Sequence, residues 1–256
     1  MPSPLDRICV STWSFHTLFE QAGKIDALDF PEMVADRYRV HNVEIVYPHF
    51  GSSEPSYVDE FKNRLRKAHS RVVNIPIDFA ELWEKPALSS PDPVEREHAI
   101  ALYKKGIDLA AALDCPTGRC DPGTVNLDDP SLTVDSYKTL AAYGKSRGVG
   151  IVVENHGSIA RHPEVLAKIL QDSGAGALPD IGNFPDEETR ERGLRLLFPL
   201  AKGISHAKLA PQFDLAKYVQ IAKEAGFQGV FSIEAGGLGD PYDAVQQILD
   251  ALVKAL

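Results

Sequence analysis

Short apolar runs rich in β-branched residues alternate with longer amphipathic segments from one end of the chain to the other. The apolar runs predict strands over Ile8–Ser14, Asn42–Tyr47, Val72–Ile77, Thr117–Arg119, Gly150–Glu154, Ala177–Ile181, Ile204–Leu209 and Gly229–Glu234. Apolar residues repeated every three or four positions predict helices over Phe30–Arg39, Ser56–Ser70, Pro91–Leu113, Leu132–Arg147, Pro163–Asp172, Thr189–Phe198, Asp214–Ala225 and Tyr242–Leu256. Eight strand–helix units in 256 residues predict an α/β fold, a single (β/α)8 TIM barrel forming one domain over residues 1–256.

The main competing fold is an open, doubly wound parallel sheet. Such sheets usually contain fewer strand–helix units at this length, and they carry a glycine fingerprint directly after the first strand. Here the sequence TWSFH, residues 12–16, follows in that place and contains no glycine. The Pro-rich piece from Glu84 to Pro93 is interpreted as a loop before a helix and not as a domain boundary. The barrel is therefore the favoured fold.

Composition and charge limit the classes of partner. The hydrophobic fraction of 44% and the charged fraction of 25% are those of an ordinary globular protein, and the net charge of -9 argues against a basic, duplex-binding face. The N-terminal segment lacks an apolar region of signal-peptide length, and no run approaches the roughly 18 apolar residues of a membrane span. We therefore expect a cytoplasmic protein that binds neither nucleic acid nor a membrane. Cys9, Cys115 and Cys120 are expected to be reduced structural thiols.

Polar residues end or interrupt the last four predicted strands. Glu154 ends GIVVE, Asp180 ends ALPD, His206 lies within ISHAKL, and Glu234 ends VFSIE. Successive members are about one strand–helix unit apart, so a barrel brings all four to the C-terminal rim where functional residues gather. Each residue alone has an ordinary explanation, as a solvated or helix-capping glutamate, a turn-capping aspartate or a buried histidine. Four such residues at corresponding ends of four successive strands are harder to explain in that way.

Three acids crowded at one rim repel one another unless a positive charge lies among them. A divalent cation would supply that charge, and the imidazole would complete its coordination. Three oxygen ligands and one nitrogen suit Mn²⁺, with Co²⁺, Mg²⁺ and Zn²⁺ as alternatives that ligand type does not separate. The sequence therefore predicts one divalent metal ion held by Glu154, Asp180, His206 and Glu234.

The segments IVVENHG, LPDIGNF, ISHAKL and FSIEAGG resemble the xylose isomerase-like superfamily, which contains sugar phosphate isomerases and epimerases on a TIM barrel. The resemblance covers essentially the whole chain from the STWSF segment onward. It implies that the four residues are metal ligands and that Glu154 and Glu234 double as an acid/base pair. A small sugar or cyclitol is the implied substrate.

The implied chemistry starts by removing a proton from a carbon between a carbonyl and a hydroxyl group. A metal chelated by both oxygens acidifies that C–H bond and stabilises the enediolate, while one carboxylate takes the proton and another can return it. Return to the opposite face is epimerisation, return to the neighbouring carbon is isomerisation, and loss of a β-hydroxyl is dehydration. The expected function is a metal-dependent sugar isomerase or epimerase. The alternative is a lyase on the same scaffold, either an inosose-type dehydratase or a β-eliminating deglycosidase of an oxidised glycoside.

The chain departs from the ketose 3-epimerases of this superfamily at two positions. Those enzymes carry a histidine three residues after the metal aspartate, where this chain has Asn183, and an arginine shortly after the metal histidine, where this chain has none. Both differences argue against a free-ketose 3-epimerase.

Candidate substrate residues flank the predicted ligands. Lys208 lies two residues after His206, and His156 two residues after Glu154, so on an extended strand each points the same way as its ligand. The full set of expected substrate contacts is Trp13, His49, Arg119, His156, Asn183 and Lys208. Further candidates are Glu44 on the second predicted strand and Asn74 and Asp78, which frame the third.

Two other functions stay open. DNA-repair endonucleases share this barrel, but they need a multi-zinc cluster and a basic groove, for which this acidic chain offers little. A non-catalytic binding or partner subunit could keep the metal for stability. A homo-oligomer is also compatible with the sequence, because barrels of this kind often pair through their helices.

Overall fold

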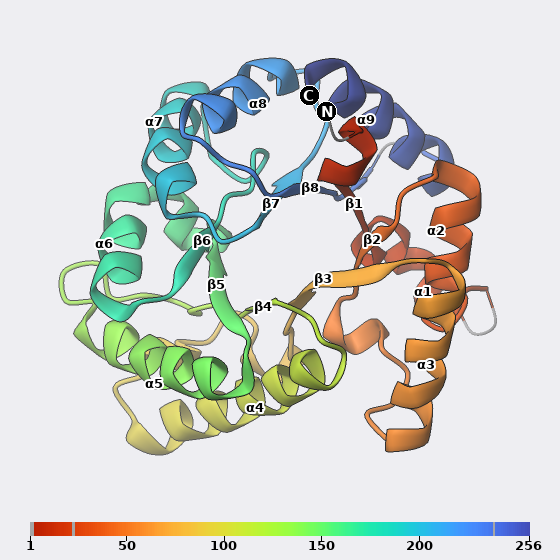
Figure 1. The fold of residues 1–256 in the computed structure, drawn as a ribbon. Coiled ribbons are helices and arrows are strands. Elements are labelled where there is room, and N and C mark those ends of the chain that lie inside the picture. The colour runs from red at the N-terminus through yellow and green to blue at the C-terminus, as the bar shows by residue number, and fades with distance from the viewer. Residues whose placement is uncertain (1–2, 22–23, 238) are drawn as a thin grey trace.

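The computed structural model describes residues 3–21, 24–237 and 239–256. Its centre is an eight-stranded sheet of parallel strands enclosed by helices (Figure 1). The strands are β1 (Ile8–Ser11), β2 (Asn42–Glu44), β3 (Arg71–Pro76), β4 (Thr117–Arg119), β5 (Gly150–Glu154), β6 (Gly176–Leu178), β7 (Ile204–Ala207) and β8 (Val230–Ile233). Their order is β6-β5-β4-β3-β2-β1-β8-β7, so the first strand pairs with the last. This arrangement confirms the predicted TIM barrel.

The barrel is nearly closed at the seam between β6 and β7. Single bridges pair Ala177 with Ala201 and Asp180 with His206 in place of a continuous ladder. His206 N donates to the Pro179 carbonyl at 3.0 Å. The seam therefore holds two of the predicted ligands side by side through the backbone itself.

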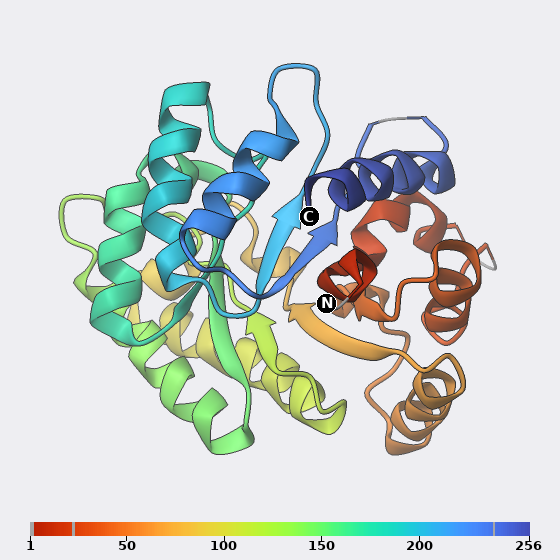
Figure 2. The same cartoon turned by 45° about the horizontal axis from the view of Figure 1, so that its top comes forward.

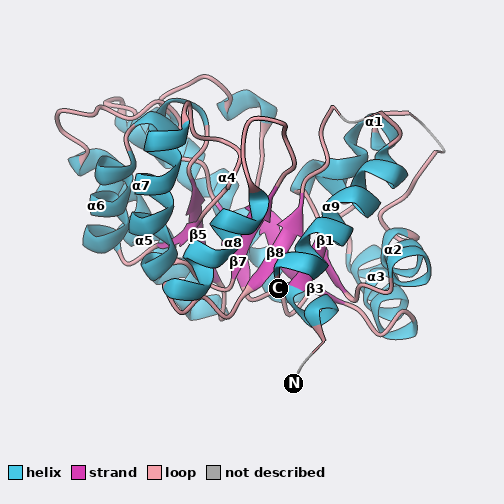
Figure 3. Cartoon of the chain, turned by 90° about the horizontal axis from the view of Figure 1, so that it is seen from above, coloured by secondary structure: helices cyan, strands magenta, loops and turns pink. Residues whose placement is uncertain are grey.

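The helices form a ring around the strands, as Figures 1 and 2 show from two directions. They are α1 (His16–Phe19), α2 (Phe30–Tyr38), α3 (Pro55–Lys67), α4 (Pro93–Ala112), α5 (Ser131–Arg147), α6 (Pro163–Ser173), α7 (Glu187–Leu197), α8 (Leu215–Glu224) and α9 (Pro241–Ala255). Short 3-10 turns occupy Pro4–Arg7, Thr12–Phe15, Tyr47–His49, Ala80–Leu82, Ala87–Ser89, Gly157–Arg161 and Phe198–Leu200. Figure 3 shows the strands in the middle, with helices on both sides of them.

The residues at several helix ends satisfy backbone groups that the helix itself leaves unpaired. The Asp214 side chain accepts from Ala216 N at the start of α8, and the Asp240 side chain accepts from Tyr242 N at the start of α9, both at 2.9 Å. Gly148 ends α5 with a φ of 76°, a left-handed conformation that other residues adopt only with strain. These local signals are the ones that let the helices be placed from the sequence.

The strand ends are where the structure departs from the predicted elements. β1 ends at Ser11 and not at Ser14, because Ser11 Oγ accepts from Trp13 N at 3.2 Å and starts the 3-10 turn Thr12–Phe15. The strands β2, β6 and β7 also end two or three residues early, and α1 is an element that the sequence did not predict. At the rim the backbone leaves the ladder and bonds to side chains and turns instead.

Buried apolar side chains form two layers. The larger layer packs between the strands and the surrounding helices. The smaller one, here called the inner cluster, consists of Cys9, Val73, Val152, Leu178, Ile204 and Val230. Its members come from six of the strands and fill the barrel with side chains, as barrels of this size require.

Gly106 lies within α4, where that helix packs on the barrel. A Cβ atom at this position would lie 2.3 Å from Ile77 Cγ2, so only glycine allows this close approach. Alanine favours a helix by about 1 kcal/mol, but overpacking a core costs about 1–3 kcal/mol. Because three Ile77 atoms would lie within 2.9 Å of the new Cβ, we expect the upper end of that cost, and Gly106→Ala should lower the free energy of unfolding by about 2 kcal/mol, measured by urea unfolding. The control Lys105→Ala, on the exposed side of the same helix, should change it by less than about 0.5 kcal/mol. A Gly106→Ala protein as stable as the wild type would contradict the packing argument.

The three cysteines are buried and form no disulfide. Burial raises the pKa of the Cys115 thiol to about 12, so this group stays protonated and unreactive at neutral pH. These properties agree with the expected structural role. Among the described residues, no helix combines the length and the apolar character needed to cross a membrane.

Candidate metal centre

Strand geometry brings the predicted ligands to the inside of the barrel rim. Glu154 lies two residues after Val152, and His206 lies two residues after Ile204, both of which belong to the inner cluster. Side chains two positions apart on a strand share a face, so both ligands point into the barrel above a core side chain. Asp180 bears the same two-residue relation to the inner cluster. The two-residue alternation of side chains that builds the core therefore also directs the ligands into the barrel.

The four predicted ligands converge on one point. One ligand atom from each of Glu154, Asp180, His206 and Glu234 can be chosen so that all lie within 4.8 Å of one another. Three carboxylate oxygens surround His206 Nδ1, at 3.1 Å (Glu154 Oε1), 3.4 Å (Glu234 Oε1) and 3.6 Å (Asp180 Oδ2). The exposed fraction is 0% for Asp180 and His206, 3% for Glu154 and 8% for Glu234. Within the described part of the chain this is the one cluster of its kind, and it could hold a metal ion.

Asp180 shows that the cluster has an oxygen available for a cation. Its Oδ1 accepts from Gly182 N at 2.6 Å and from Asn183 N at 3.0 Å, so this oxygen caps the turn. Its Oδ2 is buried and accepts no well-aligned hydrogen bond from the described residues, although Lys208 Nζ lies 2.7 Å away. Leaving a buried charged oxygen without such a bond is unfavourable. A divalent cation would satisfy it, so the donor set fits a metal ion.

The cluster shifts the pKa values of its members in different directions. Burial lowers the pKa of His206, but the surrounding carboxylates, Glu234 first, outweigh burial and hold it well above its ordinary value. Burial raises the pKa of Glu154, but the His206 and Arg119 cations bring it well below its usual range. For Glu234 burial prevails and the pKa is raised, despite the opposing effect of His206 and Lys208. Glu154 therefore stays ionised, while Glu234 holds a proton more readily.

Arg119, predicted as a substrate residue, lies against the cluster at the end of β4. It donates to Glu154 Oε2, and its Nη2 reaches both carboxylate oxygens of Asp78 at 2.5 and 2.6 Å. Its side chain is 8% exposed, so this cation is withdrawn from water between two acids. Arg119 thereby fixes one oxygen of a predicted ligand and offsets the negative charge of the site.

Lys208 and Asn183, two other predicted substrate residues, also contact the cluster. Lys208 Nζ lies 2.7 Å from Asp180 Oδ2 and 3.1 Å from Glu234 Oε2. It donates to Asn183 Oδ1 at 2.9 Å, and Asn183 Nδ2 donates to Glu154 Oε1 at 2.9 Å. The amide and the ammonium group therefore link ligands on three different strands or loops.

His156 opens the loop after β5 and pairs with Asp121. Its Nδ1 lies 3.1 Å from Asp121 Oδ2, and this hydrogen bond raises the pKa of His156. The histidine side chain is 57% exposed, which leaves the remainder of the ring open to solvent. The structure thus places a partnered, accessible histidine two residues after a predicted ligand.

Trp13 and His49 make their contacts elsewhere at the rim. Trp13 is 40% exposed and stacks on the ring of His16 with centroids 4.7 Å apart. His49 Nδ1 lies 3.0 Å from Thr12 Oγ1, and its ring stacks on Phe19. Burial lowers the pKa of His49 to about 4, so this imidazole is neutral at pH 7. Within the described residues, neither side chain forms a hydrogen bond to the four predicted ligands.

Asn155 positions the backbone of Asp180, a role that was not predicted from the sequence. Its side chain is fully buried, donates to the Asp180 carbonyl at 3.0 Å and accepts from Asp180 N at 2.8 Å. These bonds continue the pairing of β5 with β6 beyond Leu178, where the strand ladder stops. An amide directly after Glu154, in a strand end that is otherwise apolar, is the signal that could have indicated this role.

We expect Asn155→Ala to destabilise the protein by about 1–3 kcal/mol for each Asp180 backbone group left unpaired and buried. It should also weaken metal binding, because Asp180 loses its fixed place beside Glu154. Urea unfolding and metal titration measure the two effects. The matched control is Asn126→Ala, which removes side-chain bonds to Asp128 N and Asp129 N on the surface. Equal effects of the two substitutions would show that Asn155 has no special role.

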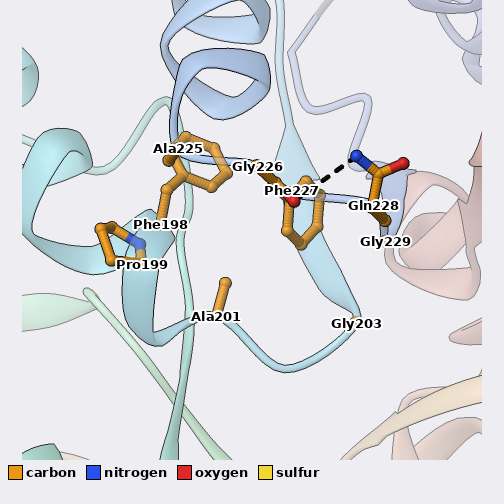
Figure 4. Close-up of a pocket in the computed structure, with 9 residues that line it drawn as sticks. All are labelled: Phe198, Pro199, Ala201, Gly203, Ala225, Gly226, Phe227, Gln228 and Gly229. Atoms are coloured by element: carbon orange, nitrogen blue, oxygen red, sulfur yellow. Dashed lines mark hydrogen bonds between the residues drawn. The ribbon is translucent and has the colours of Figure 1, made fainter.

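A separate hollow lies at the opposite end of the barrel (Figure 4). Gly203 and Gly229, which directly precede β7 and β8, form part of its wall. Its lining consists of Phe198, Pro199, Ala201, Gly203, Ala225, Gly226, Phe227, Gln228 and Gly229. None of these side chains is charged, so the hollow offers neither an acid, a base nor a strong metal ligand. The chemistry of the described chain is concentrated at the C-terminal rim.

Comparison with known proteins supports the architecture. A family model described as xylose isomerase-like TIM barrel matches residues 40–255. No curated protein matches the chain. Among solved structures, the IOLI protein with a bound zinc atom is 15% identical, with a TM-score of 0.76 and 97% of each chain covered. At this identity the likeness shows the fold alone.

Two further solved structures resemble the chain to a similar degree. A xylose isomerase-like TIM barrel protein from Mycobacterium smegmatis, solved in complex with magnesium, is 17% identical, with a TM-score of 0.68 and 100% of each chain covered. D-Psicose 3-epimerase from Clostridium cellulolyticum H10, solved with D-tagatose, is 16% identical. That comparison has a TM-score of 0.69 and covers 97% of this chain and 95% of the epimerase.

Proposed function

Because the chain belongs to the xylose isomerase-like TIM barrel family, we propose that it is a divalent-metal-dependent isomerase or epimerase of a small polyhydroxy carbonyl compound. The observation that carries this proposal is the buried convergence of Glu154, Asp180, His206 and Glu234 on one point. Structures of similar fold that contain zinc or magnesium, or that are sugar epimerases, add support.

The four converging side chains would hold the cation, with His206 contributing Nδ1, the nitrogen that faces the carboxylates. We propose Mn²⁺ as the native ion, because three carboxylates and one imidazole suit it. When bound, the ion would polarise adjacent carbonyl and hydroxyl oxygens and thereby acidify the carbon-bound proton between them.

Glu154 and Glu234 are the proposed acid/base pair, and their different surroundings give them different roles in proton transfer. Arg119 and Asn183 fix both oxygens of Glu154, which keeps that carboxylate ionised and oriented. Glu234 has Lys208 Nζ at 3.1 Å as its close cation and holds a proton more readily. Glu234 therefore suits the removal of the carbon-bound proton and its return to the same or the adjacent carbon. In an epimerisation, Glu154 would exchange a proton with the opposite face of the same substrate carbon.

The remaining site residues are proposed to bind substrate. Lys208 and Asn183 already direct polar atoms toward the cluster, so they would hold substrate oxygens next to the cation. Arg119 would bind a substrate oxygen next to Glu154, and His156 would bind one from the open loop after β5. Trp13 and His49 would act at the wider rim, where exposed or stacked rings can cover a sugar face.

A lyase is the second candidate, and the His156–Asp121 pair is the observation that favours it. Loss of a β-hydroxyl requires a proton for the departing oxygen. His156 is held by Asp121, has a raised pKa and is largely open to solvent, so it could donate that proton. Asn183, in place of the histidine of ketose 3-epimerases, also separates this chain from those enzymes.

Metal content tests the proposal. The wild-type protein and the variants Glu154→Gln, His206→Ala and His98→Ala are reconstituted with Mn²⁺, dialysed and measured by elemental analysis. His98 is the matched control, since it pairs with Glu81 on the surface. We expect about one ion per chain in the wild type and in the control, and a nearly complete loss in the other two variants.

The same preparations then separate the two candidate functions. Incubation with a panel of ketoses and inososes is followed by mass spectrometry and chromatography of the products. An isomerase or epimerase conserves the substrate mass, whereas a dehydratase releases one water. A correctly folded wild-type protein that binds no divalent ion after reconstitution would overturn the proposed function.

A further inference from the structure

We propose that Glu44 is a positioning residue that holds the His206 imidazole with Nδ1 directed at the cation. The inference rests on the proposed metal centre and goes beyond it, since Glu44 is not among the four converging ligands. Glu44 ends β2 and His206 lies within β7, so the two residues meet across the inside of the barrel.

The two ring nitrogens of His206 have different surroundings. Nδ1 faces oxygens of the three ligand carboxylates at 3.1–3.6 Å. Nε2 lies 3.2 Å from Glu44 Oε2 on the other side of the ring. A metal-binding imidazole must leave one nitrogen unprotonated, and the hydrogen bond at the other nitrogen decides which one. The geometry therefore assigns the N–H to Nε2 and the metal to Nδ1.

A second residue fixes Glu44 Oε2 as an acceptor. Asn74 Nδ2 donates to the same oxygen at 2.9 Å. Thr117 Oγ1 lies 2.9 Å from both Asn74 Oδ1 and the Val73 carbonyl, and the carboxylate acceptor itself orients the amide with its NH₂ group toward Glu44. Oxygens of an ionised carboxylate can only accept, so His206 Nε2 donates to Oε2 beside the Asn74 amide. The chain Thr117–Asn74–Glu44–His206 thus joins β4, β3, β2 and β7 inside the barrel.

Stability alone gives little reason for this chain of polar groups. Glu44, Asn74 and His206 are all 0% exposed, and buried ion pairs often contribute less than apolar side chains of similar volume would. Glu44 also adds a fourth carboxylate to a crowded acidic site, with Oε1 accepting no hydrogen bond from the described residues. A carboxylate that accepts from a metal-binding histidine has a recognised benefit, since it orients the ring and raises its basicity. That benefit accounts for a buried acid at this position.

Glu44 acts through His206 and not on the substrate. Its carboxylate has no exposed surface and lies on the side of the imidazole away from the ligand carboxylates. The effect of removing its charge should therefore appear first in cation affinity. Loss of an outer partner of a metal ligand typically weakens metal binding about 10- to 100-fold.

The first test is titration of the full-length protein with Mn²⁺ alone, by isothermal titration calorimetry. We expect Glu44→Gln to weaken Mn²⁺ binding by about 10- to 100-fold, because glutamine keeps the shape but lacks the charge. The matched control is Asn42→Ala, two residues earlier on β2, which removes buried bonds to the Ile8 and Asp6 carbonyls. Asn42→Ala should lose stability without losing Mn²⁺ affinity.

A second measurement needs no variant and is insensitive to folding defects. Wild-type protein with ¹⁵N-labelled histidine is loaded with ¹¹³Cd²⁺, and the nitrogen coupled to cadmium is identified by NMR. We expect the coupling at His206 Nδ1 and a protonated Nε2. Coupling to Nε2 would overturn the inference, as would unchanged Mn²⁺ affinity in a folded Glu44→Gln protein. If the wild type binds no cation at all, the proposed function fails as well, so the two failures are distinguishable.

Discussion

Replacing Arg119 by glutamine is expected to lower the free energy of unfolding of the metal-free protein by about 3–5 kcal/mol. Arg119 is the buried cation that pairs with both Asp78 and Glu154. Without it, Asp78 would lose its cation and Glu154 would keep only Asn183 and His206, and a buried charge that has lost its partner is far less favourable than a missing surface pair. Urea unfolding in the presence of a chelator, followed by circular dichroism, measures the loss.

The matched control for this prediction is another paired arginine. Arg147 Nε lies 3.1 Å from Asp108 Oδ1, and both side chains are about half exposed. Arg147→Gln should therefore cost less than about 1 kcal/mol. A comparable loss in the two variants would show that the Asp78–Arg119–Glu154 arrangement has no special energetic role. Adding Asp78→Asn to Arg119→Gln should recover part of the stability, because the carboxylate that has lost its cation is then removed.

A bound divalent ion changes the expected size of the Arg119→Gln effect. Glu154 is a proposed ligand, so a cation would neutralise the carboxylate that loses its arginine. The loss of stability should then be smaller in the presence of saturating Mn²⁺ than in its absence. The difference between the two conditions reports on the coupling between Arg119 and the metal centre, independently of any substrate.

The barrel and its cluster could be predicted because both depend on short-range patterns. A strand has a two-residue period, and the spacing from Glu154 to Asp180 to His206 matches one strand–helix unit. In any closed barrel those positions meet at one rim, so no tertiary detail was needed to bring the side chains together. The same reasoning placed Arg119 and Lys208 near the acids, where the structure has them.

The contacts that orient the ligands could not be predicted in this way. The pairing of Glu44 with His206 crosses the inside of the barrel and depends on the order of strands that are distant in sequence. The role of Asn155 depends on where the β5–β6 ladder stops, and strand ends are decided by competition between backbone and side-chain hydrogen bonds. Ser11 illustrates that competition, since its hydroxyl ends β1 three residues before the apolar pattern does.

Mn²⁺ affinity is expected to keep rising with pH above pH 6.5, by up to about tenfold per unit, because the ion and a proton compete for His206 Nδ1. The surrounding carboxylates hold the pKa of His206 well above its ordinary value in the metal-free protein. Below that raised pKa the imidazole is doubly protonated, so each increase in pH removes some of the competing proton. Above it the competition ends and the affinity levels off.

This range of pH distinguishes the clustered imidazole from an ordinary one. An unperturbed histidine has a pKa of about 6.5, so its effect on metal binding would already be levelling off above that pH. Calorimetric titrations in buffers of different ionisation enthalpy should also show about one proton released for each ion bound at pH 7. An affinity that is constant from pH 6.5 to 7.5, with no proton released, would mean that His206 is neutral before the ion arrives.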